Sequence, residues 1–329
     1  IHQLHHDVMA DAELVDLIRH KYRIKNTVGY SLNALVDYHD PLEILIHLMV
    51  GSEGTLGFVS EVTYNTVPEH PFKATGLIPF SDPQAAGRAI IEMANGGVQV
   101  TTGVTAAEYI ERRALATVEH LPPMAPLLPW LTADSPAVLI DVTAPDEATL
   151  LAEIARAEDL LKRHGATHID LSRDAQRSAA LWDIRKGFFT SGGAARPKGT
   201  SMLTEDVAAP IERLAEFVVD MRNLLDKHGY DDAIIFGHAL AGNLHFQMSD
   251  NFAESGAAEK FDVFNQELSQ LVSVRYQGSL KAEHGTGRAI AAFVEAEWGA
   301  KAYGLMHRIK AIFDPERLLN PGVLLNDDP

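Results

Sequence analysis

Three features are scarce or missing in this sequence, and each absence excludes a class of protein. Cysteine is absent, so these residues alone cannot form disulfides, thiolate metal sites or iron–sulfur clusters. Lys and Arg number 28 against 45 Asp and Glu, and the formal net charge is −17 at pH 7. Nucleic acid is therefore not an expected partner, because phosphate binding needs a concentrated basic surface. The apolar runs are too short for a transmembrane segment, and no stretch resembles a signal peptide.

The remaining composition is typical of a folded soluble protein. The chain has 329 residues, of which 46% are hydrophobic and 22% charged, and this length allows two domains or one large domain. It begins at Ile1 within polar sequence, which we interpret as the start of a fragment. The absence of cysteine fits a reducing compartment, and we expect a cytoplasmic location.

Hydrophobic periodicity predicts an α+β fold. Helices are expected at 11–22 and 41–50, followed by a glycine-rich turn and a strand at 58–64. From Pro71 onward, short strands alternate with amphipathic helices, which favours a largely antiparallel sheet with helices on one face. The Pro-rich stretch 121–130 is expected to be a surface loop or lid. The further expected strands are 74–80, 98–104, 137–143, 166–171, 201–207, 233–238 and 243–248; the further expected helices are 82–95, 106–117, 145–164, 174–189, 210–228, 254–276 and 286–312, the last broken near Gly299.

The stretch "FGHALAGNLHFQ" places His238 and His245 on either side of an Ala-Gly-Asn turn signal. Gly237, Gly242 and Asn243 disfavour a helix here, so we predict a hairpin whose two imidazoles meet at one edge. Two hydrogen-bonded histidines in an ordinary hairpin would explain this stretch equally well.

A second stretch, "KAEHGTGR", contains an adjacent Glu283 and His284 before two glycines. Side chains of neighbouring extended residues point to opposite sides, so the two residues should have separate roles. Two histidines and one glutamate make a three-ligand site for Zn²⁺ or Mn²⁺ with positions open to substrate, and His284 remains as a base. Taken alone, the stretch also fits an exposed loop with an incidental Glu-His pair.

Two further stretches offer binding groups. In "LWDIRKGFF", Arg185 could bind a carboxylate through its fork of donors, although a lone helical Arg is more often a solvated surface residue. The glycine-rich "GSEGTLG" has neither the Walker ending nor the dinucleotide GxGxxG spacing. Its glycines would still let the backbone approach a cofactor.

Seven motifs in order resemble those of the FAD-linked D-2-hydroxyacid dehydrogenases of the vanillyl-alcohol-oxidase superfamily: "KNTVGYSL", "GSEGTLGFVSEVT", "LWDIRK", "LTEDVAAPIERL", "FGHALAGNLHF", "KAEHGTGR" and "FDPERLLNPG". That family includes D-lactate, glycolate and D-2-hydroxyglutarate dehydrogenases. The resemblance covers nearly the whole chain, and it is closest to long bacterial members in which an iron–sulfur region follows the flavin module. It implies that 1–70 is the C-terminal part of an FAD-binding domain, and that 71–329 is a ferredoxin-like substrate domain.

The resemblance also implies site roles and partners. His238, His245 and Glu283 would be metal ligands, His284 the general base, and Arg185 the group that binds the substrate carboxylate. FAD would lie beside Asn320 and the loop residues Gly51, Ser52, Glu53, Gly54, Thr55 and Gly57. The expected activity is oxidation of D-2-hydroxyglutarate or D-lactate, with an electron acceptor or iron–sulfur region outside this sequence. Association with the inner membrane would be peripheral.

The resemblance implies that this sequence lacks the N-terminal part of the family's FAD domain, which carries the glycine-rich loop around the pyrophosphate. We therefore predict that this fragment alone is inactive. Two other classes of function compete with the dehydrogenase. A flavin-independent metal hydrolase or lyase could use the same two histidines and glutamate, but it would give the flavin-side motifs no role. A non-catalytic ferredoxin-like binding module would need neither Glu283 nor His284.

Overall fold

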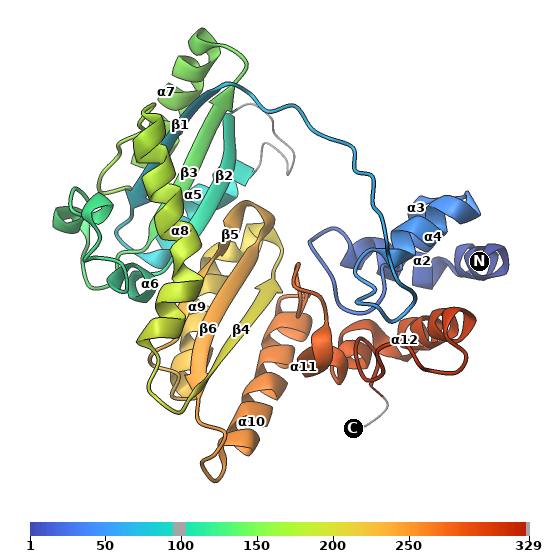
Figure 1. Cartoon of the computed structure of the whole chain (residues 1–329). Helices are drawn as coiled ribbons and strands as arrows, with labels where there is room; N and C mark the ends of the chain where they lie inside the picture. The colour runs from blue at the N-terminus through green and yellow to red at the C-terminus, as the bar shows by residue number, and fades with distance from the viewer. Residues whose placement is uncertain (95–102, 327–329) are drawn as a thin grey trace. The chain divides into compact units, whose positions relative to one another are not determined.

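The computed structural model describes residues 1–94 and 103–326. The chain divides into two compact units (Figure 1). Unit 1 contains Ile1–Asn65, Asp206–Ala209 and Leu268–Pro329, and unit 2 contains Thr66–Glu205 and Pro210–Glu267. The first boundary lies close to the one expected at residue 70. The C-terminal segment belongs to the same unit as the N-terminal one. The expected division of the sequence into 1–70 and 71–329 does not include this grouping.

Unit 2 is built on a six-stranded sheet with the strand order β1-β3-β2-β5-β6-β4. The pairs β1–β3, β3–β2, β2–β5 and β5–β6 are antiparallel. This topology confirms the expected α+β fold with a largely antiparallel sheet. The strands are β1 (Phe72–Pro79), β2 (Gly103–Ile110), β3 (Ala137–Ala144), β4 (Ser201–Ala208), β5 (Ile234–His238) and β6 (Asn243–Asp250).

Helices pack on both faces of this sheet. Successive strand residues point to opposite faces, so Val142 packs with Leu150 of α7 while Leu139 packs with Ile184 of α8. In Figure 1, α8 runs across the sheet. The sequence predicted helices on one face of the sheet, whereas α7 and α8 pack on opposite faces. The helices of unit 2 are α5 (Pro83–Ala94), α6 (Arg112–Ala116), α7 (Glu147–Arg163), α8 (Ala175–Ala195), α9 (Leu214–Lys227) and α10 (Ala257–Ser269, ending in unit 1).

Unit 1 is mainly helical. Asp11 accepts a hydrogen bond from the Leu14 amide and caps α2, and Asp40 caps α4 in the same way, so both expected N-terminal helices form. Gly299 has a non-helical φ of 78° inside α12, which is the expected break. The helices are α1 (His2–Met9), α2 (Ala12–Lys21), α3 (Ala34–Asp37), α4 (Pro41–Met49), the π-helix Gln270–Arg275, α11 (Gly287–Ala291) and α12 (Val294–Phe313).

Several expected elements are wrong. The run 58–64 forms no strand, and its alternating side chains Phe58 and Tyr64 are 93% and 80% exposed. The expected helix 106–117 is right only in its second half, where α6 forms. Residues 106–110 belong to β2, because pairing with β3 and β5 on both sides overrides the helix propensity of the Ala and Glu residues there. The expected strand 166–171 contributes only an isolated bridge at Ala166. Most of the expected strand 98–104 lies outside the described residues.

The Pro-rich stretch contains two short 3-10 helices, Pro122–Met124 and Leu128–Trp130. Met124 and Leu127 pack into the core beneath α8, which ties part of this stretch to the sheet.

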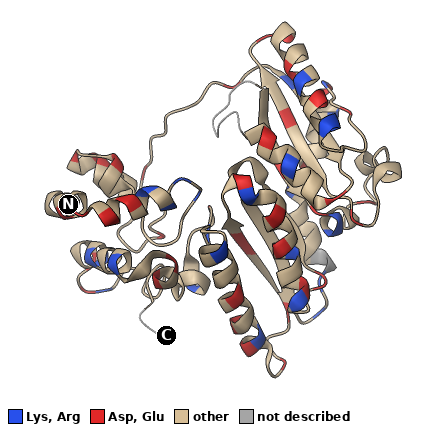
Figure 2. Cartoon of the chain, turned by 180° about the vertical axis from the view of Figure 1, so that it is seen from behind, with Lys and Arg blue, Asp and Glu red and all other residues tan. Residues whose placement is uncertain are grey.

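None of the helices in the described ranges is both long and apolar enough to cross a bilayer. Lys and Arg alternate with Asp and Glu along the helices (Figure 2), in keeping with the scattered basic residues of the sequence.

Candidate active site

The β5–β6 hairpin brings His238 and His245 together within unit 2. His238 ends β5, Gly242 turns the chain with a φ of 64°, and His245 follows on β6. The two ring centroids lie 5.0 Å apart with perpendicular planes. A Cβ at Gly237 would stand 2.3 Å from the Asn243 carbonyl oxygen, so the close approach of the two strands requires glycine there. The predicted hairpin is confirmed.

Glu108 lies directly opposite His238 on the neighbouring strand β2. Its Oε1 is 2.6 Å from Nδ1 of His238, and its Oε2 accepts a 2.7 Å hydrogen bond from Nε of Arg185. Burial opposes ionisation of this carboxyl, but the hydrogen bond with His238 and the charge of Arg185 hold the pKa of Glu108 below its usual range. Arg185, on α8, also lies over the Phe236 ring at 4.7 Å from its centroid. The arginine expected to bind substrate is thus anchored in unit 2 rather than solvated at the surface.

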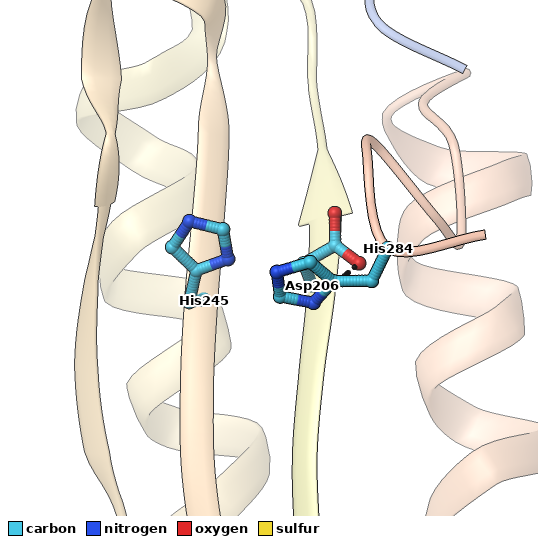
Figure 3. A group of neighbouring side chains, drawn as sticks. All are labelled: Asp206, His245 and His284. Carbon is cyan, nitrogen blue, oxygen red and sulfur yellow. Dashed lines mark ion pairs between the residues drawn. The ribbon is translucent and has the colours of Figure 1, made fainter. Parts of the chain in front are cut away.

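The "KAEHGTGR" loop of unit 1 is held by a buried carboxylate, that of Asp206. Oδ2 of Asp206 accepts hydrogen bonds from the amides of Ala282 and Glu283, at 2.9 and 2.8 Å. Its Oδ1 forms an ion pair with Nδ1 of His284 at 3.2 Å, drawn as the dashed line in Figure 3. The same figure draws His245 on its strand of unit 2. Asp206 thereby fixes both the loop backbone and the imidazole of the expected base.

Glu283, the expected third metal ligand, forms an ion pair with Lys25 at 2.6 Å within unit 1. Both side chains are partly exposed, and exposed pairs contribute about 0 to 1 kcal/mol. A divalent cation could therefore take this carboxylate from Lys25 at little energetic cost. Because Glu283 belongs to unit 1 and the histidine pair to unit 2, their meeting at one ion stays a prediction.

The expected cofactor residues gather in one region of unit 1. Asn320 donates a hydrogen bond to the Glu53 carbonyl oxygen at 2.8 Å, and the Glu53 carboxylate accepts from the Gly287 amide. Gly51, Glu53 and Gly54 all have positive φ angles, so the loop turns irregularly. Ser52 and Thr55 are buried, and the Thr55 hydroxyl donates to the Ser52 carbonyl oxygen; Gly57 lies just after them. The fold thus joins Asn320 to a loop more than 260 residues earlier.

The "KNTVGYSL" motif lies against the "KAEHGTGR" loop. The amide of Thr27 donates to the Lys281 carbonyl oxygen at 2.8 Å, and the amide of Gly29 donates to the Thr286 hydroxyl at 2.8 Å. Three motifs that are far apart in the sequence therefore form one hydrogen-bonded group of loops.

Sequence reasoning missed Glu108 and Asp206. Each is an acidic residue among apolar strand residues, in "AAEYI" and "LTEDVA", and each is at least nine-tenths buried. A carboxylate seldom enters a strand core without a partner. That rule could have marked both residues, but it could not have named the histidines that they meet.

Comparisons with known proteins show which family this sequence matches. The family model described as "FAD linked oxidases, C-terminal domain" matches residues 69–324. Glycolate oxidase subunit GlcD of Bacillus subtilis (strain 168) is 28% identical, covering 86% of this chain and 57% of the relative. D-2-hydroxyglutarate dehydrogenase of Xanthomonas citri pv. viticola is 28% identical over 96% of this chain and 62% of the relative.

A more distant relative covers almost the entire chain. Mitochondrial D-lactate dehydrogenase [cytochrome] of Kluyveromyces lactis is 24% identical, over 98% of this chain and 52% of the relative. The chain thus spans between 52% and 62% of the length of these three proteins.

Solved structures share the fold at low sequence identity. A 4-ethylphenol oxidase from Gulosibacter chungangensis superimposes with a TM-score of 0.56 at 15% identity, over 79% of this chain and 55% of that one. An alkyldihydroxyacetonephosphate synthase gives a TM-score of 0.54 at 13% identity, over 84% of this chain and 49% of that one. From the matched family model and the relatives that agree with it, this chain belongs to the FAD-linked oxidases, of which it carries the C-terminal domain.

Proposed function

We propose that the protein oxidises a D-2-hydroxy acid to the 2-oxo acid with FAD, and that D-2-hydroxyglutarate or D-lactate is the substrate. The relatives named for glycolate, D-lactate and D-2-hydroxyglutarate share this chemistry. The observation that carries the proposal is the pairing of His238 with His245 beside the anchored Arg185. A ligand pair and a carboxylate-binding group are the protein parts that a chelated hydroxy acid requires.

The residues fit a divalent metal. His238 and His245 offer imidazole nitrogens, and Glu283 would add a carboxylate, a donor set suited to Zn²⁺ or Mn²⁺. The Nδ1 contact between His238 and Glu108 is the kind of support that metal-bound histidines usually have. When bound, such an ion would lower the pKa of the substrate hydroxyl.

The loops of unit 1 fit a flavin. The positive φ angles in 51–54 and the Asn320 side chain beside them provide exposed backbone groups and an amide at one place. We infer that Gly51, Ser52, Glu53, Gly54, Thr55, Gly57 and Asn320 line the bound cofactor. FAD would accept the hydride that leaves C2 of the substrate.

The protein's own groups would position the acid and take its proton. The guanidinium of Arg185 would hold the substrate carboxylate, with its Nε fixed by Glu108. An ionised Asp206 only accepts hydrogen bonds, so its contact with Nδ1 of His284 favours the tautomer in which Nε2 carries the lone pair. His284 would therefore take the hydroxyl proton through Nε2 near neutral pH.

Two alanine variants of the full-length protein test this division of roles. His284→Ala should leave metal content nearly unchanged while slowing anaerobic flavin reduction by ~10² to 10⁴, the usual range for loss of a general base. Glu283→Ala should lower metal occupancy and flavin reduction together. If His284→Ala instead lost the metal, and reduced flavin at the normal rate once metal was restored, the assignment of His284 as the base would be wrong.

A further inference from the structure

We propose that Glu108 is a positioning residue that sets the tautomer of His238 and fixes Arg185 relative to it. This inference rests on the proposed function, because it concerns the ligand role of His238 and the substrate-binding role of Arg185. Glu108 itself would touch neither metal nor substrate. It would act through the two side chains that do.

Glu108 occupies a position from which its carboxylate reaches both groups. Its Cα lies opposite that of His238 in the antiparallel pairing of β2 and β5, so the two side chains leave the same face of the sheet. Arg185 approaches that face from α8. The Glu108 side chain is 5% exposed, and it divides its two oxygens between His238 and Arg185 at 2.6 and 2.7 Å.

The charge of Glu108 fixes the direction of both hydrogen bonds. An ionised carboxylate only accepts, and the Nε of Arg185 only donates. Nδ1 of a neutral His238 must therefore carry the proton, and its Nε2 must carry the lone pair. The His238 side chain is 41% exposed while the carboxylate behind it is buried. Glu108 thus holds the imidazole at Nδ1. The nitrogen that can bind a metal is Nε2, which points away from Glu108.

Replacement of Glu108 by glutamine would reverse this tautomer without changing the shape of the side chain. Arg185 can only donate, so the glutamine oxygen would have to face Arg185. The glutamine NH₂ group would then face His238 and donate to Nδ1, which moves the imidazole proton to Nε2. A protonated Nε2 cannot bind a metal ion. Glu108→Gln should therefore weaken metal binding at His238 even though the fold is kept.

Glu111 offers a matched control three residues further on. It is also buried, and its Oε2 accepts hydrogen bonds from the Ile235 amide and from Arg222 at 3.1 and 3.4 Å. Glu111→Gln removes a buried, arginine-paired charge from the same part of the chain, but Glu111 contacts an arginine and a backbone amide rather than an imidazole. Both variants should lose thermal stability, whereas only Glu108→Gln should affect His238.

The experiment has two readouts on the full-length protein. The first is the ¹⁵N shift of the His238 ring nitrogens in metal-free, histidine-labelled protein, at a pH where the imidazole is neutral. The wild type and Glu111→Gln should show the proton on Nδ1, and Glu108→Gln should show it on Nε2. The second is Zn²⁺ affinity by competition with a chromophoric chelator, which should fall ~10- to 100-fold in Glu108→Gln alone, the usual effect of losing an outer-shell partner.

The outcomes separate this inference from the proposed function. A wild-type protein that binds no Zn²⁺ would remove the metal site from the proposed function, while the ring-nitrogen shifts would still report on Glu108. An unchanged His238 tautomer in Glu108→Gln would overturn the inference. Equal losses of Zn²⁺ affinity in Glu108→Gln and Glu111→Gln would also overturn it, because they would indicate a general structural effect.

Discussion

His238 and His284 each have a buried carboxylate placed at Nδ1. Glu108 holds His238 in unit 2, and Asp206 holds His284 in unit 1. In both cases the acidic partner is buried and the imidazole is partly exposed, at 41% and 42%. A carboxylate in this position selects the tautomer with its lone pair on Nε2. Such a nitrogen can bind a metal ion or accept a proton, which are the two roles that the proposed function requires.

Substitution of Arg185 tests its role at the residue scale. Arg185→Lys keeps the charge but loses the planar fork and the Nε bond to Glu108. We expect kcat/KM for every 2-hydroxy acid to fall by ~10²-fold, about 2.7 kcal/mol in transition-state binding. Arg113→Lys is the control, because Arg113 forms an exposed ion pair with Asp226 and its replacement should leave kcat/KM unchanged. Steady-state kinetics that showed no difference between the two variants would refute the assignment.

At the scale of elements, the β5–β6 hairpin depends on one glycine. Gly237→Ala would place a Cβ within 2.3 Å of the Asn243 carbonyl oxygen, and the strands would have to move apart. Overpacking of this kind costs about 1 to 3 kcal/mol, and we expect the variant to lose metal affinity as well as stability. Thermal unfolding and Zn²⁺ titration measure both effects.

Gly187→Ala is the control for this substitution. Gly187 lies in α8, and a Cβ there would meet no atom within 4 Å, so the change to a better helix former should keep or raise stability. A Gly237→Ala variant as stable and as metal-competent as Gly187→Ala would mean that the close approach of β5 and β6 is not required.

A buried ion pair links α2 to α12. Lys21 and Glu297 are 3.7 Å apart with side chains 8% and 0% exposed, and burial raises the pKa of Glu297 although the charge of Lys21 opposes this rise. Lys21→Met would leave Glu297 buried without its cation, which should cost about 3 to 5 kcal/mol at pH 7. Lys301→Met, which alters an exposed pair with Asp11, should change stability little.

The pH dependence of Lys21→Met follows from the raised pKa. Above pH ~4.5, the ordinary range of a glutamate, the folded variant binds more protons than the unfolded chain. The free energy of unfolding therefore falls as pH rises through the folded pKa of Glu297. We expect the deficit relative to wild type to be largest at pH 7 and to shrink toward pH 4.5, as measured by chemical denaturation. A deficit that stays constant over this range would contradict the role of Glu297.

Sequence patterns predicted the elements whose signals are local. The helices at 11–22 and 41–50 and the break at Gly299 were foreseen from spacing and single residues, and in the structure Asp11 and Asp40 cap the two helices. The second half of β2 was expected to be helical because "AAEYI" runs into "ERRALA", which does form α6, and its position between β3 and β5 makes it a strand. The hairpin histidines were foreseen for the same local reason, whereas Glu108 and Asp206 were not, because their partners lie more than 75 residues away.

At the scale of the whole molecule, the residues with proposed roles are divided between the two units. His238, His245 and Arg185 belong to unit 2, and Glu283, His284, Asp206 and the cofactor loops belong to unit 1. The family model covers all but three residues of unit 2. In unit 1 it covers the segment Asp206–Ala209 and most of the segment Leu268–Pro329. The proposed function is therefore that of the full-length protein, which with FAD bound would oxidise 2-hydroxy acids of the D configuration.

Anaerobic titration of the full-length protein tests this claim most directly. D-2-hydroxyglutarate and D-lactate are added separately, with their L enantiomers as controls, and the visible absorbance of the flavin is followed. We predict that at least one D acid bleaches the flavin and that its L enantiomer does not, because hydride transfer requires C2 to face the flavin while the carboxylate is held. A flavin that no D-2-hydroxy acid reduces, or that both enantiomers reduce at the same rate, would contradict the account.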